Sequence, residues 1–139
     1  MENKKRKILI TDDDSFLLDM YALKFSQNNF EVYTASSGIH ALEKLKDGLS
    51  PDVLLVDIIM PEMDGFEVLT QINTQKLCPD CVKIILSNKS EQQDIDEGNK
   101  LGVAGYIVKA NFTPAEVIDQ VIKILEKSSQ QRPVEKTEN

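Results

Sequence analysis

The chain has 139 residues, of which 41% are hydrophobic and 28% are charged, and its 16 basic and 23 acidic side chains give a net charge of -7. This length fits one domain with a continuous core, and the acidic balance argues against binding of nucleic acid or an anionic membrane by the domain as a whole. The sequence shows no apolar run of membrane-spanning length, no signal-peptide pattern and too few cysteines for a disulfide framework, so we expect a cytoplasmic protein.

Five short β-forming runs alternate with stretches of helical period. The expected strands are 7–11 (KILIT), 31–35 (EVYTA), 53–56 (VLLV), 82–86 (VKIIL) and 105–109 (GYIVK), and the expected helices lie near 17–25, 39–46, 65–73, 90–102 and 113–125. Strands that alternate with helices in this way predict an α/β fold with a parallel sheet and helices on its faces. The first, third and fourth runs are almost continuously apolar, which is typical of strands buried on both faces.

The last two helices and the end of the chain differ in how clearly they are defined. Thr113, Pro114 and Glu116 form a capping-box pattern with proline at the first helical position, which fixes the start of the last helix. The helix expected over 90–102 has few apolar anchors and contains Gly98, so it should be the loosest. Residues 128–139 are polar and non-periodic, and we expect a disordered tail or the start of a linker.

Three consecutive carboxylates, Asp12, Asp13 and Asp14, follow the first strand. Two like charges about 4 Å apart repel by roughly 4 kcal/mol at the effective dielectric near a protein surface, so such a cluster needs a cation or raised pKa values. Asp14 is best interpreted as the N-cap of the first helix, because Asp is a preferred capping residue. Asp12 and Asp13 remain as candidate ligands.

Polar side chains also follow three other strands. Asp57 comes directly after VLLV, Ser87 after VKIIL, and Lys109 ends GYIVK. Ligands of open parallel sheets bind beyond the carboxyl ends of the strands, so these groups should converge with Asp12 and Asp13 on one rim. Carboxylate oxygens suit a hard cation such as Mg2+. A carboxylate is also able to attack phosphorus when a metal and a lysine neutralise the transferring group.

These residues give the chain a specific resemblance to the receiver domains of two-component response regulators. The motifs ITDDD, LLVDIIMPEMDGFE, ILS and YIVK occur in that order at compatible spacings, and the resemblance covers a single domain over residues 6–127. It implies a flavodoxin-like fold with a five-stranded parallel sheet in the order 2-1-3-4-5 and five helices. The site residues it implies are Asp57 as phosphoacceptor; Asp12, Asp13, Asp57 and the backbone carbonyl of Ile59 as Mg2+ ligands; and Ser87, Tyr106 and Lys109 as phosphoryl-contacting or switch residues.

The same resemblance implies a function and its partners. We expect a stand-alone receiver that accepts a phosphoryl group from a histidine kinase or a phosphotransfer protein and then switches a protein-binding face. Such a protein assists its own phosphorylation and dephosphorylation but is not an enzyme. We further expect an unknown downstream protein target, no direct nucleic-acid or membrane binding, and a monomer or a phosphorylation-dependent dimer.

The sequence departs from the family pattern at two positions. Ala110 follows Lys109, where the family usually has a proline in a cis peptide; a cis bond before a non-proline residue costs about 3 to 4 kcal/mol, so we expect a trans peptide here. Position 59, commonly polar or small in the family, is Ile. We hypothesise that bulky Ile59 impedes attack by water on the phosphorylated site. Lys89, just beyond Ser87, is placed where it could face the phosphoryl group.

Two other function classes compete with this interpretation. ITDDDS resembles the D-x-D motif of haloacid-dehalogenase-type phosphatases, with Asp12 as nucleophile and Asp14 as acid/base, but those enzymes need an acidic pair after the lysine, and none closes a strand after Lys109. A receiver-like scaffold that works without phosphorylation is the second alternative. Three further features are interpreted as structural: the CPDC pair Cys78 and Cys81, the helical His40, and the basic run 4–7.

Overall fold

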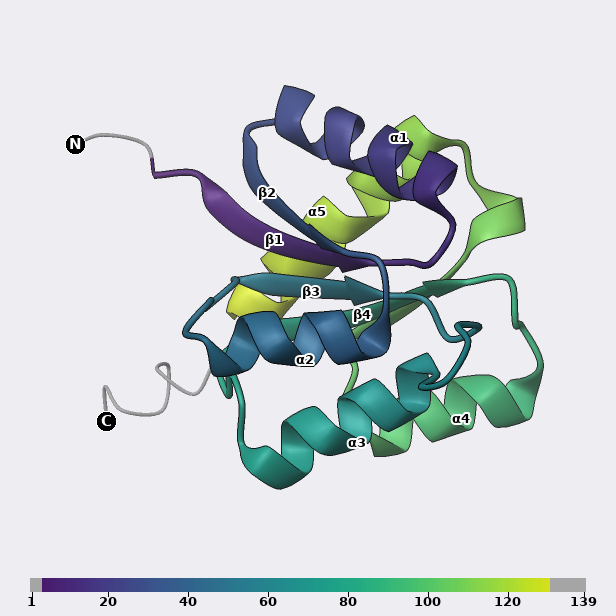
Figure 1. Ribbon diagram of the computed structural model, residues 1–139. Coiled ribbons are helices and arrows are strands. Elements are labelled where there is room, and N and C mark those ends of the chain that lie inside the picture. Colours follow the sequence, from purple (N-terminus) through teal and green to yellow (C-terminus); the bar gives the residue numbers. More distant parts are fainter. Residues whose placement is uncertain (1–3, 131–139) are drawn as a thin grey trace, which may run out of the picture.

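The structure is a computed structural model that describes residues 4–130 (Figure 1). Its elements are, in chain order, β1 (Arg6–Thr11), α1 (Ser15–Gln27), β2 (Phe30–Ala35), α2 (Gly38–Lys46), β3 (Val53–Val56), α3 (Gly65–Gln75), β4 (Val82–Ser87), α4 (Gln92–Lys100), β5 (Gly105–Val108), a 3-10 turn (Lys109–Asn111) and α5 (Pro114–Gln130). Every strand and helix expected from the sequence is present, with small shifts at the ends.

The five strands form one parallel sheet in the order β2-β1-β3-β4-β5, which confirms the predicted fold class. Strands β1 and β3 are neighbours, with Thr11 opposite Val56 at their carboxyl ends. The chain leaves β1 towards β2 on one side, while β3 lies on the other. The order of the strands therefore reverses between β1 and β3, which is where an open α/β sheet presents its ligand site.

Two apolar cores lie on opposite faces of the sheet. Alternate residues of β1 point to different faces, so Ile8 and Ile10 pack with α1 and α5, whereas Leu9 packs with α2 and α3. Figure 1 shows α1 and α5 on one side of the sheet and α2, α3 and α4 on the other. Because both faces of β1, β3 and β4 are covered, these strands are buried as predicted.

Local signals in the sequence fix the helix starts. Asp14 caps α1, because its Oδ1 accepts a hydrogen bond from the Leu17 N–H at 3.1 Å. The Thr113 hydroxyl accepts from the Glu116 N–H at 3.2 Å, and the Glu116 carboxylate accepts from the Thr113 N–H at 2.8 Å. The predicted N-cap of α1 and the predicted capping box of α5 are therefore confirmed.

Helix α4 approaches the sheet more closely than its polar sequence suggests. Its buried residues are Asp94 and Gly98, and a Cβ added to Gly98 would lie 2.9 Å from Cδ1 of Ile85 in β4. Gly98 therefore permits close packing of the helix on the sheet.

The carboxyl end of α5 extends beyond the expected domain boundary. Helix α5 continues through Gln130, so residues 128–130 are helical and do not belong to the expected tail. The sequence between Pro114 and Gln130 contains no glycine and no further proline, so no breaking residue ends the helix before this point. The rest of the expected tail, 131–139, lies outside the described residues.

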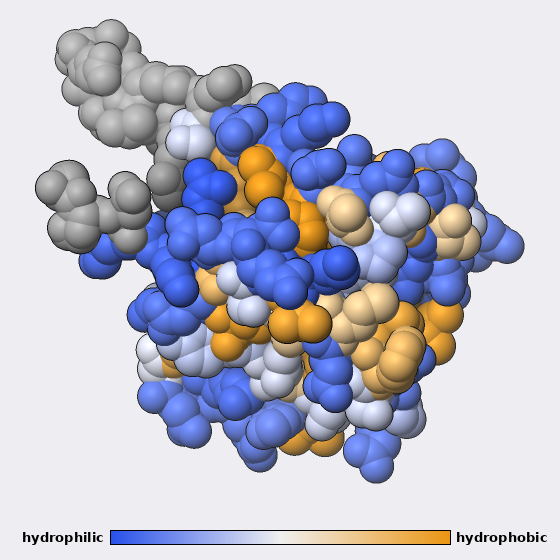
Figure 2. All heavy atoms as spheres, turned by 90° about the horizontal axis from the view of Figure 1, so that it is seen from above, coloured by the Kyte–Doolittle hydropathy of each residue, from blue (hydrophilic) through white to orange (hydrophobic). Residues whose placement is uncertain are grey.

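The surface agrees with the composition. The side that carries α1, seen from above in Figure 2, is largely hydrophilic, with apolar patches between the polar side chains. Within residues 4–130, no helix combines the length and the apolar character needed to cross a bilayer.

Candidate functional site

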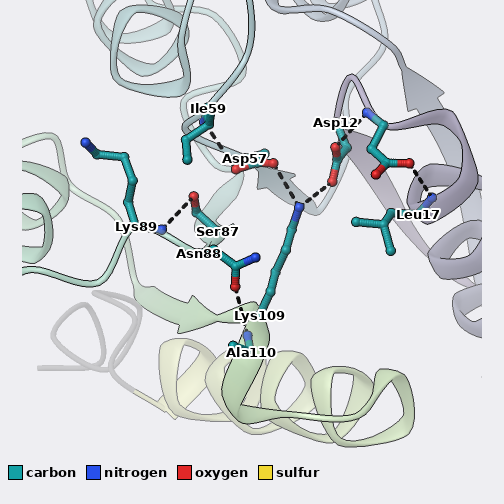
Figure 3. Close-up of polar contacts among 10 residues, drawn as sticks. Asp12, Leu17, Asp57, Ile59, Ser87, Asn88, Lys89, Lys109 and Ala110 are labelled. Carbon is teal, nitrogen blue, oxygen red and sulfur yellow. Dashed lines mark hydrogen bonds and ion pairs between the residues drawn. The ribbon is translucent and has the colours of Figure 1, made fainter.

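Three charged side chains from three strand ends meet at the predicted rim. Lys109, at the end of β5, places its Nζ 2.8 Å from Oδ2 of Asp12 and 2.8 Å from Oδ2 of Asp57 (Figure 3). Asp12 follows β1 and Asp57 follows β3, and the Asp57 N–H donates to the Thr11 carbonyl at 3.0 Å. The adjacency of β1 and β3 thus brings the two carboxylates together, and Lys109 lies between them.

The third carboxylate completes an acidic cluster. One carboxylate oxygen from each of Asp12, Asp13 and Asp57 lies within 4.8 Å of the others. Asp12 and Asp57 are buried, whereas Asp13 is exposed at the rim. A set of three carboxylates open to solvent on one side fits a hard divalent cation that keeps part of its water shell. The cluster is therefore able to bind a metal ion.

Burial and the ion pairs shift the pKa values of Asp12 and Lys109. Burial raises the pKa of Asp12, although hydrogen bonds from Lys109 and the Asp14 N–H partly offset this effect. Burial by itself would lower the pKa of Lys109, but its hydrogen bonds to Asp12 and Asp57 outweigh burial and raise the pKa of the ammonium group. Lys109 is therefore held in its charged form next to the carboxylates.

The predicted phosphoryl-contacting and switch residues lie on the neighbouring strands. Ser87 is fully buried at the end of β4, and its Oγ accepts a hydrogen bond from the Lys89 N–H at 3.3 Å. Figure 3 shows Ser87 on the side of Asp57 that faces β4. The Tyr106 hydroxyl donates to the Lys89 carbonyl at 2.7 Å, and burial raises the pKa of Tyr106 to about 12. Tyr106 is therefore connected to Ser87 through the loop between β4 and α4, and it remains protonated at neutral pH.

Lys89 is engaged away from the acidic cluster. Its Nζ lies 3.5 Å from Oδ1 of Asp94, a carboxylate of α4 whose side chain is 8% exposed. Asp94 also accepts a hydrogen bond from the Glu91 N–H at 3.2 Å. The sequence-based placement of Lys89 near the phosphoryl site therefore does not describe this structure, because a buried carboxylate on α4 pairs with its ammonium group.

The segment after β3 is shaped around Asp57. The Ile59 N–H donates to Oδ1 of Asp57 at 3.2 Å, and the Ile59 side chain is 56% exposed. A Cβ added to Gly65 would lie 2.3 Å from the Asp57 carbonyl oxygen, so only glycine fits at the start of α3. The role of the Ile59 carbonyl as a metal ligand stays a prediction.

One contact at the site involves a residue that the sequence-based reasoning did not identify. Oδ1 of Asn88 accepts a hydrogen bond from the Ala110 N–H at 2.9 Å. The sequence does contain one indication of this contact. Ala110 has a backbone N–H group that a proline at this position would lack, and this group needs an acceptor. As expected for the bond before Ala110, the described residues contain no cis peptide.

The CPDC pair lies at the amino ends of β3 and β4, opposite the end of the sheet that carries the acidic cluster. The Cys78 Sγ donates to the carbonyl of Pro51, which precedes β3, at 3.5 Å, and Cys81 directly precedes β4. The chain between the cysteines forms a turn in which the Cys81 N–H donates to the Cys78 carbonyl at 3.1 Å. Within the described residues the only group of three potential metal ligands is the acidic cluster at the carboxyl ends of the strands. The cysteine pair is therefore not part of the candidate site.

The two thiols should differ in reactivity. A hydrogen bond from Cys81, together with one from Ser50 and the charge of Lys83, lowers the pKa of Cys78 to about 7 despite partial burial. We expect alkylation of Cys78 by iodoacetamide to rise as pH increases through about 7, because only the thiolate reacts, while buried Cys81 stays largely unlabelled. Peptide mapping after timed labelling measures this. Native Cys78 labelling with a midpoint near the ordinary value of about 8.5 would contradict the expectation.

Comparison with known proteins agrees with the fold. The family model of the response regulator receiver domain matches residues 8–122. The chain belongs to this family and is a receiver domain of a two-component response regulator.

Its relatives include transcriptional regulators. The alkaline phosphatase synthesis transcriptional regulatory protein PhoP of Bacillus subtilis is 33% identical over 134 residues, which is 96% of this chain and 54% of that protein. The transcriptional regulatory protein SrrA of Staphylococcus aureus is 35% identical over 132 residues, 95% of this chain and 52% of that protein. The chain thus spans about half the length of these relatives.

Solved structures show the same fold. A CheY-like response regulator receiver domain protein from Methanospirillum hungatei has a TM-score of 0.81 at 23% identity, over 92% of this chain and 99% of that one. The receiver domain of the Francisella response regulator 1452 has a TM-score of 0.77 at 29% identity, over 89% of this chain and 99% of that one.

Proposed function

We propose that this receiver domain is a phosphorylation switch that accepts a phosphoryl group on Asp57 from the phosphohistidine of a kinase or a phosphotransfer protein. The observation that carries the proposal is the contact of Lys109 with both Asp12 and Asp57 beside the buried Ser87. This arrangement supplies an acceptor carboxylate, a fixed cation and a hydroxyl donor at the carboxyl ends of neighbouring strands. The family membership supports the same role.

The side chains divide the chemistry among them. An oxygen of the Asp57 carboxylate attacks phosphorus, an O–P bond forms, and the P–N bond to the donor imidazole breaks. Mg2+ held by Asp12, Asp13 and Asp57, with the Ile59 carbonyl as a further ligand, would neutralise charge on the transferring group. Lys109 stabilises the phosphoryl oxygens from the side of β5, and the Ser87 hydroxyl donates to one of them. The protein keeps the phosphoryl group on its own side chain, so it acts as a switch and not as an enzyme.

The response would pass through the loop between β4 and α4. Ser87 precedes that loop, the Tyr106 hydroxyl holds its Lys89 carbonyl, and Lys89 pairs with Asp94 of α4. The Ser87 hydroxyl is able to donate to the phosphoryl group while its Oγ still accepts from the Lys89 N–H, so a shift of Ser87 towards the phosphoryl group would pull this loop with it. Moving a two-state equilibrium from 1:99 to 99:1 takes about 5.5 kcal/mol of differential binding, and charge-assisted contacts from Ser87 and Lys109 could supply much of this.

The partners follow from the same proposal. The domain would receive its phosphoryl group in the cytoplasm and act on a protein target, as a monomer or a phosphorylation-dependent dimer. Its net charge of -7 supports protein partners over nucleic acid for the domain itself. The relatives that the chain matches are longer transcriptional regulators. We propose that the described receiver domain carries out the phosphorylation switch by itself.

Mass spectrometry tests the proposal directly. The protein is incubated with a small acyl phosphate, with and without Mg2+, and the added mass is mapped to a peptide. We expect one phosphoryl group on Asp57, formed much faster with Mg2+. No added mass under any condition would support the phosphorylation-independent scaffold instead.

Ile59 should control how long the phosphoryl group persists. Its side chain is exposed directly beside Asp57, and it lines a surface pocket together with Met60, Phe66 and Lys89. We expect Ile59→Asn to speed dephosphorylation by roughly three- to tenfold, because a smaller polar side chain admits water; tenfold corresponds to about 1.4 kcal/mol of barrier. The decay of phosphorylated protein after donor removal measures this. Ile39→Asn, at an exposed position of α2, is the control, and an unchanged rate in Ile59→Asn would refute the hypothesis.

A further inference from the structure

The backbone next to Lys109 is held by a side chain from another loop. Lys109, Ala110 and Asn111 form a 3-10 turn directly after β5. The Ala110 N–H donates to Oδ1 of Asn88 at 2.9 Å, across a separation of 22 residues in sequence. Figure 3 shows Asn88 reaching from the end of β4 to Ala110, alongside the stem of Lys109.

This contact lies where the chain that carries Lys109 leaves the sheet. Strand β5 is at the edge of the sheet and pairs only with β4 in the described chain. The one backbone bond that closes the turn is from the Phe112 N–H to the Lys109 carbonyl, at 3.3 Å. A long lysine side chain has high rotamer entropy, so a fixed backbone beneath it favours the placement of Nζ between the two carboxylates.

We propose that Asn88 is a positioning residue for Lys109. Its side-chain carbonyl holds the Ala110 N–H, which keeps the Lys109 backbone oriented so that Nζ reaches Asp12 and Asp57. The inference rests on the proposed function for the consequence that Lys109 is thereby kept ready for the phosphoryl group. Asn88 directly follows Ser87, so the contact also joins the loop that carries the hydroxyl to the loop that carries the lysine.

The arrangement fits the departure of this chain from the usual lysine-proline pair. A proline at position 110 would have no N–H to donate, and the Asn88 side chain would then lack this partner. With Ala110, the trans backbone carries a donor at the surface, and Asn88 satisfies it. Asn88 and Ala110 should therefore act as a pair.

A simpler explanation is an exposed hydrogen bond with no effect on the site, since Asn88 is itself exposed. The two explanations differ in what happens to Lys109. If the contact has no role in positioning, its loss would leave Lys109 in place between the carboxylates. Loss of a positioning contact would free Lys109 from the carboxylates without unfolding the domain.

Two measurements that do not depend on phosphorylation test this difference. In Asn88→Ala we expect the Ala110 amide to exchange roughly five- to tenfold faster, and Lys109 to be acylated several-fold faster by dilute acetic anhydride, relative to the exposed Lys123. Asn88→Asp keeps an acceptor at the same place and should restore the Ala110 protection. Asn111→Ala, in the same turn, is the matched control. Unchanged Lys109 acylation in Asn88→Ala would overturn the inference.

A double-mutant cycle and a pair of affinities complete the test. In an Ala110→Pro background the donor is absent, so Asn88→Ala should have little further effect on Lys109 acylation; an equal effect in both backgrounds would overturn the pairing.

Asn88→Ala should weaken binding of beryllofluoride, a phosphoryl analogue, several-fold, while Mg2+ affinity stays the same or rises because Lys109 competes less. A parallel fall of both affinities would indicate general damage to the site and would contradict positioning. If the wild-type protein fails to bind beryllofluoride, the proposed function fails, while the acylation result still decides the role of Asn88.

Discussion

Replacing Asp57 by asparagine is expected to abolish covalent phosphorylation. The variant keeps the shape of the side chain and loses the nucleophilic carboxylate, so incubation with an acyl phosphate and Mg2+ should leave its mass unchanged. Asp12→Asn should behave differently, because Asp12 is proposed to hold the metal and not the phosphoryl group. We expect slower phosphorylation of that variant, with the phosphoryl group still on Asp57.

The comparison of the two variants separates the switch from a phosphatase of the haloacid-dehalogenase type. In such an enzyme Asp12 would carry the phosphoryl group and Asp57 would be dispensable. Asp52→Asn is the matched control, because Asp52 lies at the opposite end of β3 and its carboxylate accepts a hydrogen bond from the Lys7 N–H. If the Asp57→Asn variant is phosphorylated and the Asp12→Asn variant is not, Asp12 and not Asp57 would be the phosphoacceptor.

Replacing Lys109 by methionine is expected to destabilise the metal-free protein by about 3 kcal/mol. The ammonium group pairs with Asp12 and Asp57 and offsets one of their two negative charges, and the Lys109 side chain is 10% exposed. Removing one partner of a buried charge pair leaves the others uncompensated, which costs about 3 to 5 kcal/mol; we take the lower end because Asp13 and the rim are open to solvent. Mg2+ should recover much of this loss, since it supplies the missing positive charge and binds only the folded cluster.

Denaturant unfolding with and without Mg2+ measures this effect. Lys123→Met, at an exposed position of α5, should change the free energy of unfolding little in either buffer. We expect Mg2+ to stabilise Lys109→Met more than the wild type. Equal stabilisation of both proteins would mean that Lys109 does not neutralise the cluster.

The sequence was sufficient to predict the strands, their parallel arrangement and most of the site. The reason is that Asp12, Asp57, Ser87 and Lys109 each follow a recognisable strand, and parallel strands deliver their carboxyl ends to one edge. The N-cap at Asp14 could also be predicted, because capping depends on residues close in sequence. The strand order came from the family resemblance, since periodicity alone does not specify which strands are neighbours.

Contacts between distant segments could not be predicted in this way. The bond from Ala110 to Asn88, the pairing of Lys89 with Asp94, and the packing of Gly98 on Ile85 all join residues whose distance depends on the packed loops and on α4. Proximity to Ser87 in sequence suggests a place for Lys89 near the phosphoryl site, but sequence alone does not identify its partner Asp94 on α4. The lack of a side chain at Gly98 lets α4 approach β4, and the expectation that α4 is the loosest helix stays a prediction.

Phosphorylation of Asp57 is proposed to change the surface around α4. Amide hydrogen exchange, measured with Mg2+ and with or without beryllofluoride, tests it most directly. The account predicts that the largest changes occur in residues 88–102 and around Tyr106, because Ser87, Lys89 and Tyr106 connect Asp57 to this segment. Changes confined to α1, with residues 88–102 unaffected, would contradict it.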